Sequence, residues 1–208
     1  MLYMLIVFDM DGVFIEEKSS WKLIHKTYGI DNSDIVMEYK MGKIDDEEFL
    51  NKDIARWREK GVKKQDIEQI FKNVPLTKGT EECIKFLKEE GQIAIISGGI
   101  DILARRIAGF GIDYTFANGI MFKKNVPWKG IIRVPIKEKE KILKNLMKEL
   151  ELKKGEVVVI GDTKYDIGMF KMAGRSIAFN PSPGVEKYAD IVIKERNLEE
   201  LIHIWKIY

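Results

Sequence analysis

The sequence predicts an α/β fold: a doubly wound, mostly parallel sheet with an inserted α-helical cap and a small β-hairpin flap. A chain of 208 residues suits one α/β core with a smaller appendage. Short apolar runs rich in β-branched residues alternate with helical patterns, as in parallel sheets that helices cover on both faces. The predicted strands are Leu2–Phe8, Gln92–Ile96, Val157–Ile160, Ser176–Phe179 and Ile191–Ile193. The predicted core helices are Thr80–Glu90, Ile100–Phe110, Lys137–Leu152, Tyr165–Ala173 and Leu198–Lys206.

Two insertions interrupt this alternation. Residues 15–77 form a charged, glycine-poor stretch that indicates several helices and is too long for a loop. We expect a helical cap there, so that residues 1–14 and 78–208 form a discontinuous core. Within the core, residues 114–134 contain short apolar runs separated by Asn-Gly and Lys-Asn pairs, a pattern that predicts the hairpin flap. The helices expected in the cap include Trp21–Tyr28 and Asp46–Lys60.

The composition argues against several classes of protein. The 35 basic residues nearly balance the 33 acidic ones, so the charge gives no signal of a nucleic-acid partner. Cys83 is the single cysteine, which excludes an intrachain disulfide and fits a reducing compartment. The opening apolar run lacks the features of a signal peptide, and it is shorter than the roughly 20 residues that a membrane span needs. We expect a cytoplasmic protein without a membrane partner, either a monomer or a homodimer.

Two carboxylates, Asp9 and Asp11, follow the first predicted strand. If the extended geometry continues past Phe8, both side chains point to the same side. Carboxylates that converge in a partly buried site repel each other unless a cation neutralises them, and a hard divalent ion prefers such oxygen ligands. A solvated turn is the alternative, because Asp and Gly are common turn formers.

A Ser-Gly-Gly sequence at residues 97–99 follows the second predicted strand. The Ser97 hydroxyl, the unhindered backbone of Gly98 and the start of the next helix would together form an anion pocket suited to phosphate. The alternative is that Ser97 only caps the helix while the glycines form the turn.

A second pair of carboxylates, Asp162 and Asp166, follows the strand Val157–Ile160. Residues four apart share one side once a helix begins, so both carboxylates can face the same cation. Acidic residues near a helix N-terminus are also favoured by capping and by the helix dipole without any ligand, so a purely structural role stays open for Asp166.

Lys137, Lys139 and Lys141 are rival candidates for a basic group at this site. On a helix, Lys139 aligns with the apolar stripe that contains Leu143 and Leu146, whereas Lys137 and Lys141 align with polar positions. Lys139 is therefore the lysine expected to point from the buried face toward the strand ends. Its stem could instead pack while its ammonium group extends to water.

Taken in chain order, these residues resemble the signature motifs of the haloacid dehalogenase superfamily. The resemblance spans most of the predicted core, and the cap, residues 97–101, residues 113–118 and the flap are most similar to the phosphoserine phosphatase-like branch. It implies a phosphoric monoester hydrolase. The motif residues are Asp9-Met10-Asp11-Gly12, Ser97, Lys139 and Gly161-Asp162 with Asp166.

The resemblance also implies a role for each residue. Asp9 is expected to attack phosphorus and form an aspartyl-phosphate, while Asp11 protonates the leaving alcohol and then activates water. Ser97, Lys139 and the Gly98 backbone are expected to hold the nucleophile and the phosphoryl oxygens. The expected cofactor is Mg²⁺, and its expected ligands are Asp9, Asp162 and the backbone carbonyl of Asp11, with Asp166 nearby.

The resemblance defines the substrate less well. The glutamate and the cap arginine that contact the substrate in phosphoserine phosphatases fall near Lys18 and Asp53 here. We therefore expect a small phosphorylated metabolite and do not favour phosphoserine. Lys18, Ser20 and Arg56 are candidate contacts, although a solvated helix start explains the first two equally well. The alternative functions are a phosphomutase or phosphotransferase of the same superfamily, or a phosphoserine phosphatase proper. We assign no role to His25.

Overall fold

The computed structural model describes residues 4–207. A seven-stranded sheet with the order β4-β3-β2-β1-β5-β6-β7 forms the centre of this part of the chain. Neighbouring strands are parallel except for β3 and β4, which confirms the predicted α/β class. Leu2 and Tyr3 of the first predicted strand lie outside the described residues. The strands are β1 (Met4–Phe8), β2 (Gly91–Ile100), β3 (Tyr114–Lys123), β4 (Val126–Ile131), β5 (Val157–Gly161), β6 (Arg175–Phe179) and β7 (Ile191–Ile193).

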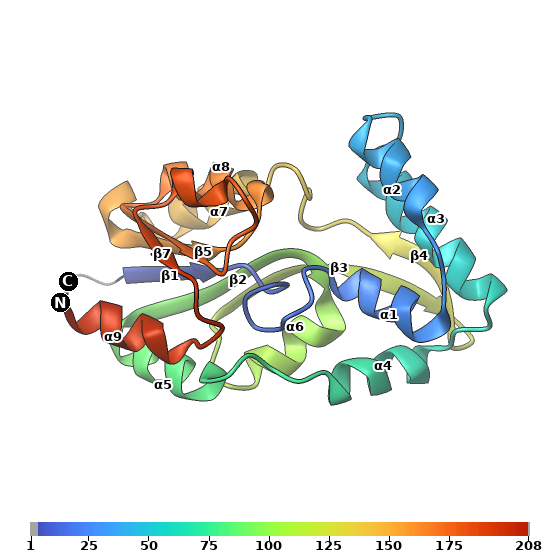
Figure 1. Ribbon diagram of the computed structural model, residues 1–208, viewed down its shortest axis with the longest axis horizontal. Coiled ribbons are helices and arrows are strands. Elements are labelled where there is room, and N and C mark those ends of the chain that lie inside the picture. The colour runs from blue at the N-terminus through green and yellow to red at the C-terminus, as the bar shows by residue number, and fades with distance from the viewer. Residues whose placement is uncertain (1–3, 208) are drawn as a thin grey trace.

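Helices cover both faces of the sheet because successive side chains of a strand point to opposite faces. Leu5 and Val7 of β1 pack into one buried cluster with α7 and α8, whereas Ile6 and Phe8 pack into another with α5, α6 and α9. Figure 1 shows these two helix layers above and below the strands. Within residues 4–207, no helix is long and apolar enough to cross a membrane. The core helices are α5 (Thr80–Glu90), α6 (Asp101–Ala108), α7 (Glu140–Glu149), α8 (Ile167–Met172) and α9 (Glu199–Ile207).

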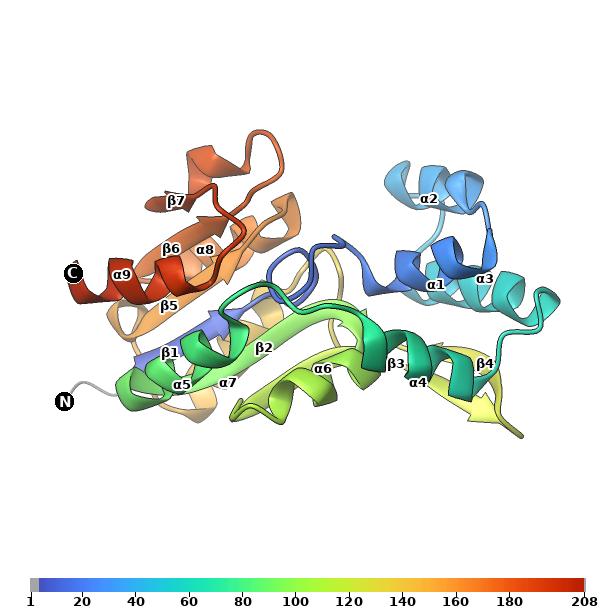
Figure 2. The same ribbon diagram turned by 60° about the horizontal axis from the view of Figure 1, so that its bottom comes forward.

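The helical segment between β1 and α5 begins and ends at adjacent points of the core. Ile15 pairs with Leu76 in an isolated antiparallel bridge, and the amide of Thr77 donates to the carbonyl of Phe14 at 2.8 Å. Figures 1 and 2 show α1, α2 and α3 beyond the carboxyl end of β1, while α4 lies along the same side as α6. The division of the chain at residues 15–77 stays a prediction. The helices of this segment are α1 (Ser20–Tyr28), α2 (Ser33–Lys40), α3 (Asp46–Glu59) and α4 (Lys64–Asn73).

Strands β2 and β3 both extend further than their sequence patterns predict. β2 does not stop at Ile96 but continues through the glycines to Ile100, and its register with β3 shifts between Ser97 and Ile100. A bulge can accommodate this sequence because glycine lacks a Cβ atom. The predicted hairpin is present as β3 and β4, but residues 114–117 also pair in parallel with β2. The flap is therefore an extension of the central sheet.

Cys83 lies on the buried side of α5. It is a free thiol with no exposed surface, and burial raises the pKa of this thiol to about 12. The thiolate is the reactive form of cysteine, so Cys83 is chemically inert in the folded protein.

Candidate active site

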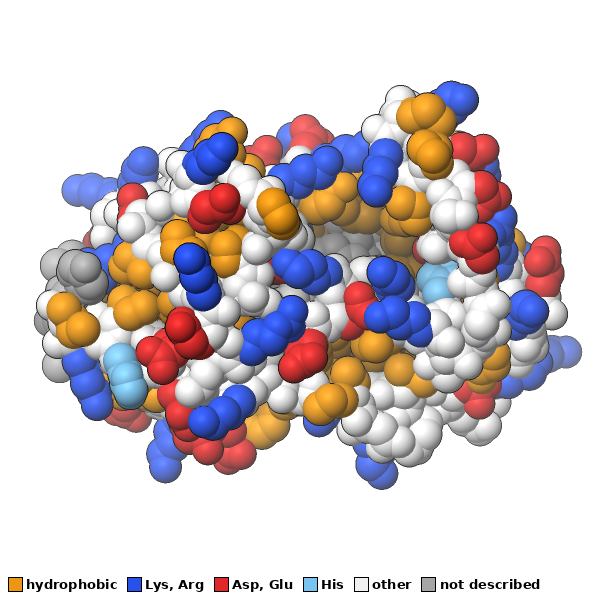
Figure 3. All heavy atoms as spheres, viewed as in Figure 1, with side chains coloured by type: hydrophobic (Ala, Val, Ile, Leu, Met, Phe, Trp, Pro, Cys, Tyr) orange, Lys and Arg blue, Asp and Glu red, His pale blue; other side chains and the backbone are white. Residues whose placement is uncertain are grey.

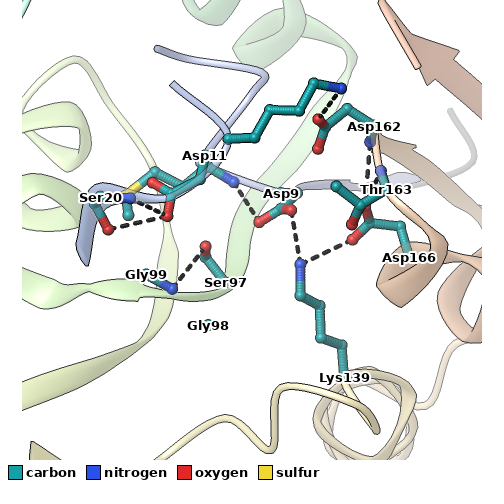
Figure 4. Close-up of polar contacts among 12 residues, drawn as sticks. Asp9, Asp11, Ser20, Ser97, Gly98, Gly99, Lys139, Asp162, Thr163 and Asp166 are labelled. Carbon is teal, nitrogen blue, oxygen red and sulfur yellow. Dashed lines mark hydrogen bonds and ion pairs between the residues drawn. The ribbon is translucent and has the colours of Figure 1, made fainter. Parts of the chain in front are cut away.

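The carboxyl ends of β1, β2 and β5 bring the predicted motif residues together, as expected for an open parallel sheet. Asp9 follows β1 directly, Ser97 lies in β2, and Asp162 follows β5. Lys139 reaches the same point from the residue that precedes α7. Figure 4 shows these side chains pointing toward one another, with Lys139 between Asp9 and Asp166.

The Asp9 carboxylate is held at both oxygens. Its Oδ2 atom lies 2.7 Å from Lys139 Nζ, and its Oδ1 atom accepts a 2.7 Å hydrogen bond from the Met10 amide. Lys139 is only 3% exposed, so its ammonium group faces the site rather than solvent. Of the rival lysines, the structure thus brings Lys139 to Asp9, as the apolar stripe predicts.

Asp166 fixes the position of Lys139. Its Oδ1 atom accepts a 2.9 Å hydrogen bond from Lys139 Nζ. Its Oδ2 atom accepts from the amides of Asp162 and Thr163, at 3.1 and 2.9 Å, and from the Thr163 hydroxyl at 3.1 Å. Thr163 is not among the residues predicted for the site, although a Thr three residues before an Asp is the spacing of a capping box.

Asp11 turns away from the other carboxylates, toward α1 (Figure 4). Its Oδ2 atom accepts hydrogen bonds from the amide and the hydroxyl of Ser20, at 2.7 and 2.9 Å. The Ser20 hydroxyl in turn accepts a 2.9 Å hydrogen bond from the Ile100 amide. Ser20, a candidate substrate contact, thus holds Asp11 in place. The Asp11 Oδ1 atom is buried and has no hydrogen-bond partner among the described residues.

Two glycines allow the close packing of this site. Gly12 has a φ of +79°, and a Cβ atom there would lie 2.2 Å from Asp162 Oδ2. A Cβ atom on Gly99 would lie 2.6 Å from Asp11 Oδ2. Real Cβ contacts are never this short, so both positions need glycine. The amide of Gly99 donates to Ser97 Oγ at 3.1 Å, which leaves the Ser97 hydroxyl hydrogen available for another acceptor.

Three buried carboxylates could hold a metal ion. One oxygen from each of Asp9, Asp162 and Asp166 lies within 4.8 Å of the others. Asp162 has no exposed surface. Its Oδ1 atom has no partner among the described residues, and its Oδ2 atom meets the Lys18 ammonium group at 3.0 Å. A buried carboxylate that is only partly compensated in this way is suited to a hard divalent cation. The Asp11 side chain lies outside this group, which agrees with a role for its backbone carbonyl alone.

Burial changes the protonation of this cluster. Burial, and next the charge of Asp9, raise the pKa of Asp11 to about 7, even though hydrogen bonds from Ser20 oppose the change. Burial also raises the pKa of Asp9 against the opposing charge of Lys139. Asp162 has a raised pKa from burial and from the charges of Asp9 and Asp166. For Lys139, burial acts to lower the pKa, but Asp166 and Asp9 outweigh it, so the ammonium form persists.

The other two predicted substrate contacts, Lys18 and Arg56, lie in different surroundings. Lys18 Nζ is 3.0 Å from Asp162 Oδ2, and it donates to Ser182 Oγ at 2.9 Å and to the Asn180 carbonyl at 3.4 Å. Its ammonium group therefore belongs to the carboxylate cluster. Arg56 is not brought to the site, because its guanidinium group is bonded to the carbonyl of Asp31 and, at 2.5 Å, to a carboxylate oxygen of Asp34.

A cavity of about 710 Å³ extends from this cluster into the helical segment. Asp9, Asp11, Ser97 and Gly98 line one end, and side chains of α1, α2 and α3 line the other. Figure 3 shows the hollow between the two lobes, with hydrophobic side chains inside and lysine or arginine side chains near its rim.

Three polar residues line the far end of the cavity, and the sequence pattern assigns none of them a role: His25, Asn32 and Asp53. One signal points to His25: it lies four residues after Trp21, so both share a face of α1. The partners of His25 come from other helices, which a local pattern does not reveal.

Known proteins that are similar to this chain belong to one family of hydrolases. A family model described as haloacid dehalogenase-like hydrolase matches residues 3–174. The chain is 32% identical over 204 residues to a phosphoserine phosphatase of Methanocaldococcus jannaschii, covering 95% of each protein. It is also similar to a substrate-bound phosphoserine phosphatase complex and to a phospho-aspartyl intermediate analogue of phosphoserine phosphatase. Each of these structures has a TM-score of 0.81 and 30% identity and is matched over 97% of this chain and 98% of its own.

Proposed function

The chain belongs to the haloacid dehalogenase-like hydrolase family, and we propose that it hydrolyses a small phosphomonoester with Asp9 as the nucleophile. The observation that carries this proposal is the arrangement of Asp9, Lys139 and Asp166. It presents a buried carboxylate whose orientation is fixed by a buried ammonium group. A carboxylate held in this way can form a covalent phosphoryl intermediate.

In the first step, a carboxylate oxygen of Asp9 attacks phosphorus while the bond from phosphorus to the leaving oxygen breaks. Asp11 donates a proton to the leaving alcohol, and its pKa of about 7 keeps a large protonated fraction at neutral pH. In the second step, the deprotonated Asp11 takes a proton from the water that hydrolyses the aspartyl-phosphate. Ser20 holds one Asp11 oxygen, so the other is available for both transfers.

The remaining groups stabilise charge on the transferring phosphoryl group. The Ser97 hydroxyl and the Lys139 ammonium are donors next to Asp9, and both are buried. Buried donors of fixed orientation stabilise developing charge more strongly than water does. A divalent cation such as Mg²⁺, held by Asp9, Asp162 and the Asp11 carbonyl with Asp166 nearby, would neutralise the phosphate charge and complete this set.

The first test is Asp9→Asn, which removes the nucleophile but keeps the volume of the side chain. We expect phosphate release from 4-nitrophenyl phosphate with Mg²⁺ to fall by about 10³-fold or more, in line with the loss of other enzymatic nucleophiles. Asp34→Asn is the matched control, since its side chain is 65% exposed and lies outside the cavity lining. Retained activity in the Asp9 variant would disprove the assignment of Asp9 as the nucleophile.

A phosphomutase would form the same phosphoenzyme but transfer its phosphoryl group to a second substrate. For the proposed phosphatase, rapid quenching should instead show a short-lived phosphoenzyme that yields inorganic phosphate at the steady-state rate. A long-lived phosphoenzyme that passes its phosphoryl group to a sugar phosphate would instead establish the mutase. O-phosphoserine belongs in the substrate panel, because the relatives named above are phosphoserine phosphatases.

A further inference from the structure

The far end of the cavity contains a buried polar cluster within an otherwise mostly apolar lining. His25 on α1 is 2% exposed and Asp53 on α3 is 1% exposed, and both line the cavity together with Asn32. Buried histidine and aspartate side chains are normally satisfied by partners within the protein. This cluster is satisfied only in part.

The hydrogen bonds of the cluster leave two atoms unpaired. Asn32 Nδ2 donates to Asp53 Oδ1 at 3.0 Å, and Trp57 Nε1 donates to His25 Nε2 at 3.3 Å. The Asn32 side-chain amide nitrogen also lies 3.3 Å from Nε2, and a neutral His25 ring that accepts at Nε2 carries its hydrogen on Nδ1. Asp53 Oδ2 lies 3.1 Å from the same Nε2 atom, so these two groups form an ion pair only when His25 is protonated. With the neutral ring, neither Asp53 Oδ2 nor His25 Nδ1 has a hydrogen-bond partner among the described residues.

Much of the cavity wall is apolar. Trp21, Val36, Phe49 and Ile136 contribute to this lining. The Trp21 ring stacks on Trp57, with ring centroids 5.2 Å apart, and its N–H group is bonded to the Gly98 carbonyl at 3.1 Å. A leaving group that crosses this region therefore meets hydrocarbon and ring faces, which do not suit a polyol.

Charged residues at the rim and at the deep end of the cavity have opposite effects on a substrate that contains a carboxylate. Lys22 and Lys40 line its rim, and neither forms an ion pair among the described residues. These lysines are exposed, so solvent and salt screen them. The Asp53 carboxylate is buried and acts at shorter range through a less polar medium. The deep end of the cavity thus selects against a carboxylate on the substrate.

We propose that this enzyme prefers phosphomonoesters whose alcohol has an apolar body and ends in a hydrogen-bond donor, an amine or a hydroxyl, that binds to Asp53. This inference rests on the proposed phosphatase function and adds the class of its leaving group. The donor supplies the hydrogen bond that Asp53 Oδ2 lacks, while the apolar body contacts Trp21 and Phe49.

A matched set of aryl phosphates tests this preference in the wild-type protein with Mg²⁺. The esters are phenyl phosphates with a para-ethyl, para-(2-aminoethyl), para-(2-hydroxyethyl) or para-(2-carboxyethyl) group, whose phenols are similar leaving groups. We expect kcat/KM for the amine or the alcohol to exceed that for the ethyl ester by about tenfold, equivalent to 1.4 kcal/mol. The carboxylate ester should be the poorest substrate. Equal values for all esters, or a preference for the carboxylate, would overturn the proposal.

Two variants then assign the preference to Asp53. Asp53→Leu removes the acceptor at similar volume, so the preference for a donor should disappear while the ethyl ester is still hydrolysed. Asp53→Asn keeps an oxygen acceptor without charge, so we expect it to lose the preference for the amine and retain that for the alcohol. A preference that survives in Asp53→Leu would contradict the assignment. If Asp53→Leu does not fold, the wild-type series still tests whether the preference exists, and Asp53→Asn still tests whether it depends on Asp53.

The result also separates two kinds of failure. If none of the esters is hydrolysed while the protein remains folded, the proposed phosphatase function fails. If the ethyl ester is hydrolysed as well as the amine and the alcohol, the phosphatase function stands and only the inferred leaving group is wrong. Asp34→Asn, which lies outside the cavity lining, should show the wild-type preferences throughout.

Discussion

Lys18 places an ammonium group where a divalent cation is expected to bind. Its Nζ atom lies 3.0 Å from the Oδ2 atom of Asp162, and its other partners, Ser182 and the Asn180 carbonyl, come from the loop after β6. The Lys18 side chain is 36% exposed, whereas Asp162 is fully buried. A partly exposed lysine can thus neutralise Asp162 in the metal-free protein and leave when a divalent cation binds.

We predict that Lys18→Gln strengthens binding of Mg²⁺, since it removes a competing cation from Asp162. The Mg²⁺ concentration at the midpoint of a thermal-shift titration should fall by about fivefold or more, at the lower end of typical coupling between competing ligands. Lys22→Gln is the matched control, because Lys22 also lines the cavity but forms no ion pair with a carboxylate of the cluster among the described residues. An unchanged or higher midpoint in Lys18→Gln would show that the ammonium group does not compete.

Residue patterns predict the charged motif positions better than the roles of their neighbours. Lys139 can be chosen from its rivals because an inward position repeats with the apolar stripe of its helix. The role of Ser20 cannot be inferred in this way, since its bond to Asp11 depends on how α1 returns to the end of β1. His25 has the same difficulty, because its contact with Asp53 forms only when α1 and α3 pack together.

At the scale of elements, Asp46 joins the helical segment to the chain that leads into α7. It lies in the first turn of α3. Its Oδ1 atom accepts a 2.5 Å hydrogen bond from the Tyr39 hydroxyl on α2, and its Oδ2 atom accepts a 2.8 Å bond from the Ile136 amide. Ile136 lines the cavity and lies just before Lys139. One carboxylate thus connects α2 and α3 to the segment that carries Lys139.

We predict that Asp46→Ala lowers the free energy of unfolding by about 1–3 kcal/mol, because it leaves a backbone amide and a phenol without their acceptor. Tyr39→Phe removes only one of the two bonds and should cost about 1 kcal/mol. Urea denaturation measures both values, and kcat/KM for an aryl phosphate should fall more in Asp46→Ala. Equal stability of the two variants would mean that the bond to the Ile136 amide contributes nothing.

Sequence periodicity predicts the core elements closely but not the pairing of their ends. Thr80–Glu90 is helical over the predicted range, because its apolar positions and flanking glycine are local signals. The extension of β2 through Ser97 to Ile100 is missed, since glycines argue against a strand unless a bulge and a neighbour accommodate them. The double pairing of β3 is missed because strand pairing is a long-range property.

At the scale of the whole molecule, the fold places several buried carboxyl groups together at the carboxyl ends of its central strands. Ordinary aspartates have a pKa of about 3.9, whereas burial and the Asp9 charge raise that of Asp11 to about 7, and those of Asp9 and Asp162 are also raised. At pH values between about 3.9 and about 7, these carboxyl groups therefore bind more protons in the native state than in the unfolded state. The contribution of these three carboxylates to the stability of the metal-free protein thus falls as the pH rises through this window.

We predict that Mg²⁺ stabilises the protein more at pH 7.5 than at pH 5.5. The ion requires ionised carboxylates, so its binding removes the protons that the metal-free native state retains and offsets the repulsion that remains at higher pH. Differential scanning calorimetry with and without saturating Mg²⁺ measures the two shifts in Tm. A larger shift at pH 5.5 would contradict the raised pKa values. Ca²⁺ provides a comparison with another hard divalent ion.

The inert thiol on α5 makes this protein convenient for spectroscopy. Cys83 has no exposed surface and its pKa is about 12, so maleimide reagents at neutral pH should leave it unmodified. Met37 is 58% exposed on α2, so the substitution Met37→Cys creates the single labelled position without replacement of the native Cys83. A fluorophore there would report whether α2 moves when a phosphate ester is added and hydrolysed.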